Sequence, residues 1–378
     1  MKNPLLSLAL ALSLLSPLRA EPQNRVVLSL ASSAEHPRNS EGGFATLKSG
    51  RILFAYSQFY GGADDNSGSR IAAITSEDQG RTWSQPRLLV DNGSNLNLMS
   101  VSFLRLADGR LAMFYLRKKS ALDCRPVVSF SADEGGTWTK PAPLISVPGY
   151  YVLNNDRVIQ TRSGRIIAPV AFHRTRRMVA SDPHAVDERG LVLWYYSDDG
   201  GATWRESTTW WSLPVASYNG LQEPGAVQLA DGSLFSWART DQGAQYGFRS
   251  LDNGLTWSAP EPTELKSPCS PASIKRLPGS AALLAIYNDH SGRFPYGATK
   301  SNYRGRTPLV AAVSTDGGRT WPTRKVLENA PQVDFCYVAM EYVDHAVLLG
   351  YAAYDRSDEH SRLLVRRVDL AWIDQARP

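Results

Sequence analysis

Cysteine is scarce in this 378-residue chain, where Cys124, Cys269 and Cys336 are the only three. An odd number this small excludes a framework of several disulfides and leaves room for one bridge at most, so we expect three buried thiols. The spacing of the three fits no zinc ligand set, and the six histidines are scattered along the chain. We therefore predict no metal site and no cofactor.

Long apolar runs are missing after residue 20. Residues 1–20 begin with Met1 and Lys2, continue with an apolar run from Pro4 to Leu18, and end with Arg19 and Ala20. This pattern favours a secretory signal peptide over a membrane span, although Leu18 stands where a smaller residue usually precedes the cut. We expect residues 21–378 to form the mature chain, secreted or periplasmic, without a membrane span.

Runs of lysine and arginine interleaved with aromatic residues are also missing, which argues against a nucleic-acid partner. The formal net charge is +5, and part of it lies in the predicted leader. A mildly basic balance suits an anionic ligand and is equally consistent with a solvated basic surface. The sequence makes no prediction about the oligomeric state.

The chain has one turn in abundance. The pattern Ser-x-Asp-x-Gly-x-Thr-Trp occurs five times, beginning at Ser76, Ser131, Ser197, Ser250 and Ser314. In such a turn the aspartate can bond nearby backbone amides, the glycine can take positive φ, and the tryptophan can tuck between strands. Five copies indicate a repeat architecture built from β-hairpins.

A second repeat gives the number of units. A turn followed by an apolar strand occurs six times, beginning at Leu47, Leu106, Thr161, Leu229, Leu277 and Tyr342. The first five copies each precede one tryptophan-bearing turn, and the sixth leads only to a final strand near residues 363–372. We therefore predict an all-β, six-bladed β-propeller over residues 21–378, with roughly 60 residues per blade. A strand from the other end of the mature chain is expected to complete the last blade.

The innermost strands of a propeller converge at one end of a central funnel, so polar residues near those strands are candidates for a site. The residues that stand out there are Asp64, Asp65, Glu223, Arg239, Arg306 and Tyr337. Taken singly, each has a simpler explanation as a rim salt bridge, a core tyrosine or turn chemistry. Their combination is what suggests a site.

The five tryptophan-bearing turns resemble the Asp boxes of the sialidase (neuraminidase) superfamily, whose fold is a six-bladed propeller. The resemblance covers essentially all of the mature chain. It implies that Tyr337 is the nucleophile, Glu223 its base, and Asp65 the acid/base residue, with Asp64 as the near alternative. It also implies that Arg239 and Arg306 belong to the triad that binds the substrate carboxylate.

These roles are chemically consistent with one another. A sialic acid carries a carboxylate on its anomeric carbon, and a neutral tyrosine avoids the repulsion that a carboxylate nucleophile would meet. Tyrosine has a pKa near 10, so it needs a base in contact. Arginine forks bind a carboxylate bidentately. The resemblance thus implies a retaining exo-glycosidase whose partner is a glycan with an acidic terminal sugar.

The chain departs from the family where the first triad arginine is expected. Sialidases usually carry an Arg-Ile-Pro motif there, and the corresponding position is Ser40, with Arg38 two residues away and Glu41 adjacent. Either Arg38 reaches the site from a shifted loop or the first arginine is absent. Glu41 would repel a substrate carboxylate if it pointed into the funnel.

Other segments are candidates for the wall of the pocket. Arg125 and Arg157 are candidates for substitute contacts to carboxylate or hydroxyl groups, against the simpler interpretation of inter-blade hydrogen bonding. The charged loop over residues 174–188 either overhangs the site or is a surface insertion.

Two other functions remain open from the sequence. One is a different carbohydrate-active propeller, a glycosidase or a lyase acting on uronate-containing polysaccharide, in which Tyr337 or a histidine would be the base and Arg306 would neutralise the uronate. The other is a non-catalytic propeller that binds glycan or protein. The joint presence of Asp65, Glu223 and Tyr337 with two arginines argues against a purely binding role.

Overall fold

The computed structural model describes residues 21–295, 305–357 and 360–374. The predicted leader, residues 1–20, lies outside this part of the chain. The only α-helix in the described residues is α1 (Leu370–Asp374), and no helix there is long and apolar enough to cross a membrane.

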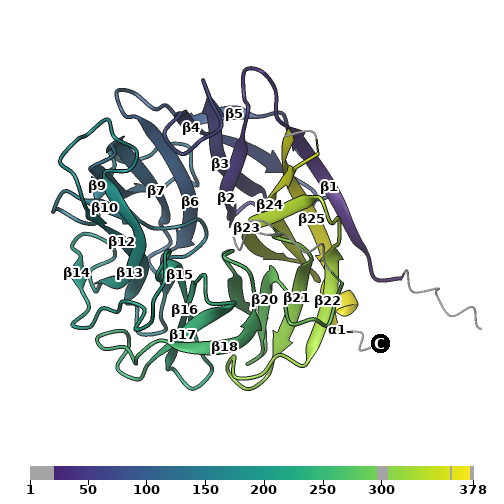
Figure 1. Cartoon of the computed structure of the whole chain (residues 1–378). Coiled ribbons are helices and arrows are strands. Elements are labelled where there is room, and N and C mark those ends of the chain that lie inside the picture. The colour runs from purple at the N-terminus through teal and green to yellow at the C-terminus, as the bar shows by residue number, and fades with distance from the viewer. Residues whose placement is uncertain (1–20, 296–304, 358–359, 375–378) are drawn as a thin grey trace, which may run out of the picture.

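Four antiparallel sheets of four strands each stand around a central axis (Figure 1). The first comprises β2 (Asn39–Thr46), β3 (Ile52–Tyr60), β4 (Gly68–Ser76) and β5 (Arg87–Val90). The second comprises β15 (Gln222–Gln228), β16 (Leu234–Arg239), β17 (Ala244–Ser250) and β18 (Glu261–Lys266). The third comprises β19 (Ser273–Arg276), β20 (Leu283–Asn288), β21 (Leu309–Ser314) and β22 (Thr323–Glu328). The fourth comprises β23 (Val333–Val343), β24 (Ala346–Asp355), β25 (His360–Asp369) and β1 (Asn24–Ala31).

The remaining nine strands form one sheet. They are β6 (Asn97–Arg105), β7 (Leu111–Ser120), β8 (Asp123–Ser131), β9 (Ala142–Pro143), β10 (Tyr150–Val152), β11 (Ile159–Gln160), β12 (Ile166–Thr175), β13 (Val186–Ser197) and β14 (Arg205–Glu206). Strand β10 pairs in parallel with β8 and antiparallel with β12, and so joins the meander β6–β9 to the meander β11–β14.

The prediction of an all-β propeller is confirmed. The predicted count of six separate blades is wrong for the described residues, which form four four-stranded blades and this one nine-stranded sheet. The physical reason is the short strand β10, whose backbone satisfies hydrogen-bonding groups on both neighbouring meanders and removes the edge between them.

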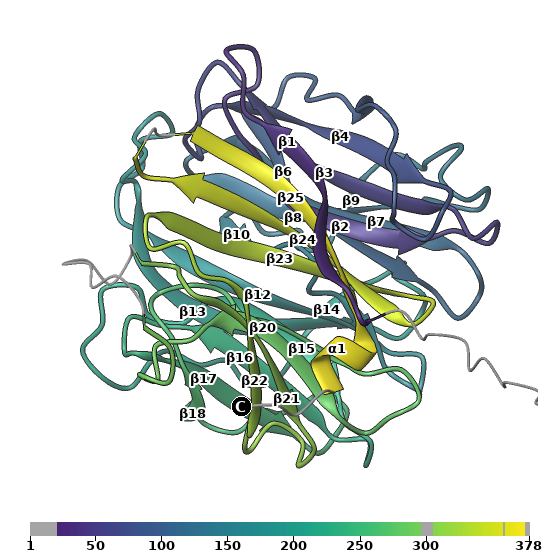
Figure 2. The same ribbon diagram turned by 90° about the vertical axis from the view of Figure 1, so that its right-hand side faces the viewer.

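The first and last strands of the described chain lie side by side. Strand β1 pairs antiparallel with β25, from Asn24 opposite Val368 to Ala31 opposite Arg362. Figure 2 shows this purple strand running along the yellow strand β25 at the outer edge of the sheet. The predicted completion of the last blade by a strand from the other end of the chain is therefore confirmed.

Each tryptophan-bearing turn closes the hairpin between the last two strands of a four-strand meander, and its side chains form one hydrogen-bond network. In the third copy, the hydroxyl of Ser197 donates to Asp199 Oδ1 at 2.7 Å and accepts from the Gly201 amide at 2.9 Å. The Thr203 amide donates to Asp199 Oδ1 at 2.9 Å, and the Thr203 hydroxyl donates to Oδ2 at 2.5 Å. The other four copies repeat these four bonds. The bonds from Thr203 and Ser197 lower the pKa of Asp199 to about 2.

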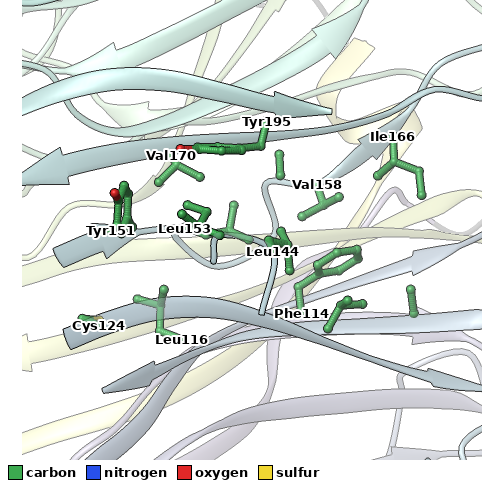
Figure 3. Packing of buried hydrophobic residues seen from close by; sticks show 14 of the residues in the cluster. Phe114, Leu116, Cys124, Leu144, Tyr151, Leu153, Val158, Ile166, Val170 and Tyr195 are labelled. Carbon is green, nitrogen blue, oxygen red and sulfur yellow. The ribbon is translucent and has the colours of Figure 1, made fainter. Parts of the chain in front are cut away.

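Aromatic and aliphatic side chains fill the space between neighbouring sheets. Trp257 of the fourth turn stacks on Trp194 with ring centroids 4.5 Å apart, and Trp321 of the fifth turn is fully buried. The largest cluster lies between the two meanders of the nine-stranded sheet (Figure 3). Its members include Phe114, Leu153 and Val170. This packing fixes the inner strands relative to one another, so the funnel has a rigid wall.

We expect Asp199→Ala to lower the free energy of unfolding by about 1–3 kcal/mol, because three donors lose their acceptor. Its neighbour Asp198 pairs with Arg165 at 2.7 Å on the half-exposed side of the same turn, so Asp198→Ala should cost less than about 1 kcal/mol. Denaturant unfolding at pH 7 measures both. Since the pKa of Asp199 is depressed, its contribution is present above pH 3.8 and lost as the pH falls through 2, and the deficit of Asp199→Ala should shrink there. Equal losses of unfolding free energy for the two variants at pH 7 would contradict the stabilising role of the hydrogen bonds to Asp199.

Candidate active site

Four innermost strands carry the same backbone irregularity. In β2, β6, β15 and β23, two residues oppose one residue of the neighbouring strand, and the first of the two has positive φ. These residues are Glu41 (φ 53°), Ser100 (62°), Glu223 (48°) and Tyr337 (59°). A bulge re-aims the side chain that a regular strand would direct onto the sheet face. All four side chains consequently line one cavity at the centre of the ring.

The cavity has a volume of about 230 Å³. Its lining combines acids, bases and a few apolar groups, namely Glu41, Asp65, Asn66, Met99, Ser100, Leu116, Lys118, Cys124, Tyr150, Val152, Asn154, His173, Pro183, Val186, Asp187, Glu188, Gln222, Glu223, Arg239 and Tyr337. Of the predicted site residues, Asp65, Glu223, Arg239 and Tyr337 are therefore brought together. Within the charged segment over residues 174–188, Pro183, Val186, Asp187 and Glu188 line the cavity. The segment therefore borders the site, which is the first of the two alternatives.

Tyr337 and Glu223 form the centre of the cavity. The Tyr337 hydroxyl donates to Glu223 Oε1 at 3.3 Å, and Glu223 Oε2 pairs with Arg239 Nη1 at 2.8 Å. Gln222 Oε1 accepts from Arg239 Nε at 3.1 Å and so fixes the guanidinium. Burial, and next to it the negative charge of Glu223, raise the pKa of Tyr337 well above its usual range, while Arg306 and Arg239 oppose this rise. The hydroxyl is therefore protonated in the free protein and has a proton acceptor in place.

Two further arginines approach the same tyrosine. The guanidinium carbon of Arg306 lies 5.6 Å from the centre of the Tyr337 ring, and the Nε atom of Arg306 has no hydrogen-bond partner among the described residues. Arg38 bonds two residues of the cavity wall, with Nη1 on Asp65 Oδ1 at 2.6 Å and Nη2 on Glu41 Oε1 at 2.7 Å. Arg38 thus reaches the site from the segment before β2, which is the first of the two alternatives for the missing motif arginine.

The two candidate acids in the loop between β3 and β4 have different surroundings. Asp64 accepts hydrogen bonds from the Asn66 amide and the Ser67 hydroxyl, both at 2.8 Å, and so serves its own turn. Asp65 lines the cavity and pairs with Arg38. Partial desolvation works against ionisation of Asp65, although its side chain is 60% exposed, and the charge of Arg38 and its hydrogen bond outweigh this effect and lower the pKa of Asp65.

Glu41 lines the cavity as well, in the position where the sequence predicted repulsion of a carboxylate. Glu41 is 3% exposed, and its Oε2 atom accepts a 2.5 Å hydrogen bond from the Ser100 hydroxyl. Burial raises the pKa of Glu41 to about 7, against the opposing charge of Arg38. The cavity therefore holds a carboxyl group that titrates near neutral pH.

The sequence interpretation missed the basic wall opposite these acids. Lys118, which is almost fully buried, donates from Nζ to the Asp65 carbonyl oxygen at 3.0 Å, to Asn66 Oδ1 at 2.8 Å and to the Tyr150 hydroxyl at 3.2 Å. His173 stands edge-on to Tyr150. A lysine two residues beyond the apolar run of β7 was the available signal, since a strand that continues past its apolar run carries a polar side chain to the funnel.

Four predicted arginines do not belong to the cavity lining: Arg38 and Arg306, which lie behind it, and Arg125 and Arg157. Arg125 is clamped by Asp123 at 2.6 Å and donates to the Ser146 carbonyl oxygen at 2.9 Å. Arg157 is 2% exposed and donates to the Ser273 hydroxyl at 3.0 Å, which ties β10–β11 to β19. In the free protein Arg125 and Arg157 are both bonded to protein groups, and their contact with a substrate carboxylate or hydroxyl group stays a prediction.

Cys124, Cys269 and Cys336 are buried and unpaired, as expected. In the part of the chain that the structure describes, no three His, Cys, Asp or Glu side chains gather closely enough to hold a metal ion.

The fold and this cluster define an Asp-box propeller with a Tyr/Glu/Arg centre. The chain belongs to the family described as BNR repeat-like domain, whose model matches residues 99–348. No curated protein matches the sequence.

Solved structures with the same fold include sialidases. The intramolecular trans-sialidase from Ruminococcus gnavus is 16% identical with a TM-score of 0.71, over 93% of this chain and 98% of that one. The NanB sialidase from Streptococcus pneumoniae is 15% identical with a TM-score of 0.68, over 92% and 71%. A protein of unknown function from Dyadobacter fermentans is 17% identical with a TM-score of 0.69, over 92% and 99%. The resemblance to the sialidase superfamily is thereby confirmed at the level of the fold.

The raised pKa of Glu41 predicts a pH-dependent stability. Its folded value of about 7 exceeds the ordinary 4.5, so the protonated carboxyl contributes stability that is fully present below pH 4.5 and lost as the pH rises through 7. Glu41→Gln removes this dependence. Relative to wild type, the variant should gain stability between pH 5 and 8 by at most about 3 kcal/mol. Urea unfolding at several pH values measures it, and parallel curves for the two proteins would refute the raised pKa.

Proposed function

We propose that this protein is a retaining exo-glycosidase that hydrolyses a terminal sialic acid, or a related acidic sugar, from glycans. The observation that carries the proposal is the hydrogen bond from the Tyr337 hydroxyl to Glu223, enclosed by arginines at the bottom of the funnel. A tyrosine held on a carboxylate, both of them mostly removed from solvent, is costly to maintain. Catalysis gives this pair a use, because the carboxylate can take the phenolic proton as the oxygen attacks.

In the proposed first step, Tyr337 Oη attacks the anomeric carbon and transfers its proton to Glu223. The bond from the anomeric carbon to the glycosidic oxygen breaks, and Asp65 donates a proton to the departing oxygen. A positioned acid of this kind contributes about 10²–10⁴-fold. The product is a glycosyl-tyrosine with the configuration inverted once.

In the proposed second step, Asp65 takes a proton from water as the water oxygen attacks the anomeric carbon from the open face. The bond to Tyr337 breaks, and the phenolate recovers its proton from Glu223. Two inversions give a sugar released with retained configuration. Tyr337 and Glu223 return to the states found in the free protein. Asp65, which takes up a proton from solvent when substrate draws Arg38 away, releases it again when the product leaves and the pair with Arg38 re-forms.

The arginines have two tasks in this scheme. Arg239 and Arg306 would bind the substrate carboxylate, with Arg38 as the third member. The substrate carboxylate would also draw Arg38 away from Asp65, and because that pair lowers the pKa of Asp65, its loss would raise the pKa toward that of a proton donor. Substrate binding would thus prepare the acid.

A lyase acting on uronate-containing polysaccharide is the second candidate, since Glu41 beside Arg38 weakens the match to the carboxylate-binding triad of a sialidase. In a lyase, the Tyr337 and Glu223 pair would remove a proton next to a uronate carboxylate and leave an unsaturated product. That product absorbs in the near ultraviolet, whereas hydrolysis creates no such chromophore. Product absorbance therefore separates the two reactions.

We expect Tyr337→Phe to reduce kcat for hydrolysis of the 4-methylumbelliferyl α-glycoside of N-acetylneuraminic acid by at least about 10³-fold. The fold should be kept, because phenylalanine fills the same space. Tyr354→Phe, at a side chain exposed on the surface, is the matched control and should leave kcat unchanged. Release of 4-methylumbelliferone measures both, and near-normal activity of Tyr337→Phe would exclude it as the nucleophile.

We further expect Arg306→Ala to weaken binding of acidic sugars by about 10–100-fold, in line with the loss of a charged hydrogen-bonding partner. Neutral sugars should be affected little. Arg125→Ala should leave binding unchanged, because Arg125 is held by Asp123 outside the cavity lining. Titration of each variant with N-acetylneuraminic acid and with galactose compares the two ligand classes, and similar losses for both sugars would show that Arg306 is structural.

A further inference from the structure

Glu41 and Asp65 share one positive partner. Arg38 donates from Nη2 to Glu41 and from Nη1 to Asp65, at 2.7 and 2.6 Å, so one guanidinium lies between two carboxyl groups. The side chain of Asp65 is 60% exposed and that of Glu41 only 4%. Water can screen the charge of Asp65 but not that of Glu41, so an ionised Glu41 is felt throughout the cavity.

The other charged or titratable groups around Glu41 offer it little compensation. They come from each element packed against the cavity, and are Arg38, Asp65, Lys118, Cys124, Tyr150, His173, Asp187, Glu188, Glu223, Arg239 and Tyr337. Of the cations, Arg38 is the one that bonds Glu41, whereas Lys118 donates to the Asp65 carbonyl oxygen, Asn66 and Tyr150, and Arg239 pairs with Glu223. A ligand carboxylate that approaches Arg38 therefore competes with Glu41 and Asp65, which already bond to this arginine.

We propose that Glu41 is a specificity-determining residue which competes with the ligand carboxylate for Arg38, so that an acidic sugar binds together with one proton taken up by Glu41. The inference rests on the proposed function, because it assumes that the ligand is acidic. The proposal adds one requirement to binding by the three arginines: the carboxyl group of Glu41, beside Arg38, must be neutral in the bound state.

The surroundings of Glu41 suit a shared proton. Ser100 Oγ lies 2.5 Å from Glu41 Oε2, and a hydroxyl can turn from donor to acceptor when the carboxyl takes up a proton. The bulge in β6 holds Ser100 with φ of 62°, which keeps its hydroxyl directed at Glu41. Burial raises the pKa of Glu41 to about 7, so the proton is available at little cost near neutral pH.

The test is calorimetric titration of the whole protein with 2-deoxy-2,3-didehydro-N-acetylneuraminic acid at pH 6, 7 and 8, in two buffers of different ionisation enthalpy. Wild type should take up close to one proton at pH 8, and Kd should rise by about tenfold per pH unit above pH 7. Glu41→Gln should take up about one proton fewer than wild type at pH 8, with Kd changing less than about twofold between pH 7 and 8. Glu77→Gln, at an exposed carboxylate paired with Arg51, is the matched control and should behave as wild type.

Ser100→Ala provides a second test should Glu41→Gln fail to fold. The Ser100 hydrogen bond stabilises ionised Glu41, so its loss should move the onset of proton uptake to higher pH. Binding without proton uptake in wild type, or equal pH dependence in wild type and Glu41→Gln, overturns the inference. Proton-coupled binding without hydrolysis of a sialoside contradicts the proposed reaction and leaves the inference about Glu41 intact. Absence of binding at every pH overturns the proposed reaction and the inference together.

Discussion

The funnel depends on one backbone constraint, the residue with positive φ that begins the bulge of an inner strand. Glycine is the usual residue in such a conformation, and a side chain there costs of order 1–3 kcal/mol. Glu41, Ser100, Glu223 and Tyr337 all bear this cost. Each sits where two residues oppose one, so the bulge and not the strand decides where the side chain points. The packed blades behind the strands hold this strain in place.

Charge balance is the second constraint on the funnel. Glu223 is matched by Arg239, whereas Arg38 is divided between Glu41 and Asp65. The first arrangement gives Tyr337 a stable proton acceptor. The second leaves one acid with a lowered pKa and another with a raised pKa on the same guanidinium. Two neighbouring carboxyl groups are thereby prepared for different protonation states, a pattern typical of sites that move protons.

The repeats made most of the fold predictable, because each turn carries its own hydrogen bonds and each apolar strand its own hydrophobic face. The number of separate blades was not predictable, since β10 is three residues long and the backbone pairing that joins its two neighbours has no sequence pattern of its own. Tyr337, Glu223 and Arg239 could be placed near one another from their positions relative to the turns. Lys118 could not be placed there, because the direction of a side chain at a strand end depends on local pairing that a sequence does not display.

The pairing of β1 with β25 has a consequence for how the ring forms. A ribosome makes Asn24–Ala31 before strands β2–β24 and His360–Asp369 after them, so the outermost strand of one sheet waits for its only partner strand while all of these strands are made. Until β25 is made, β1 has no partner strand. The ring is therefore sealed in a single late event, and an unpaired strand edge is exposed to neighbouring chains until it happens.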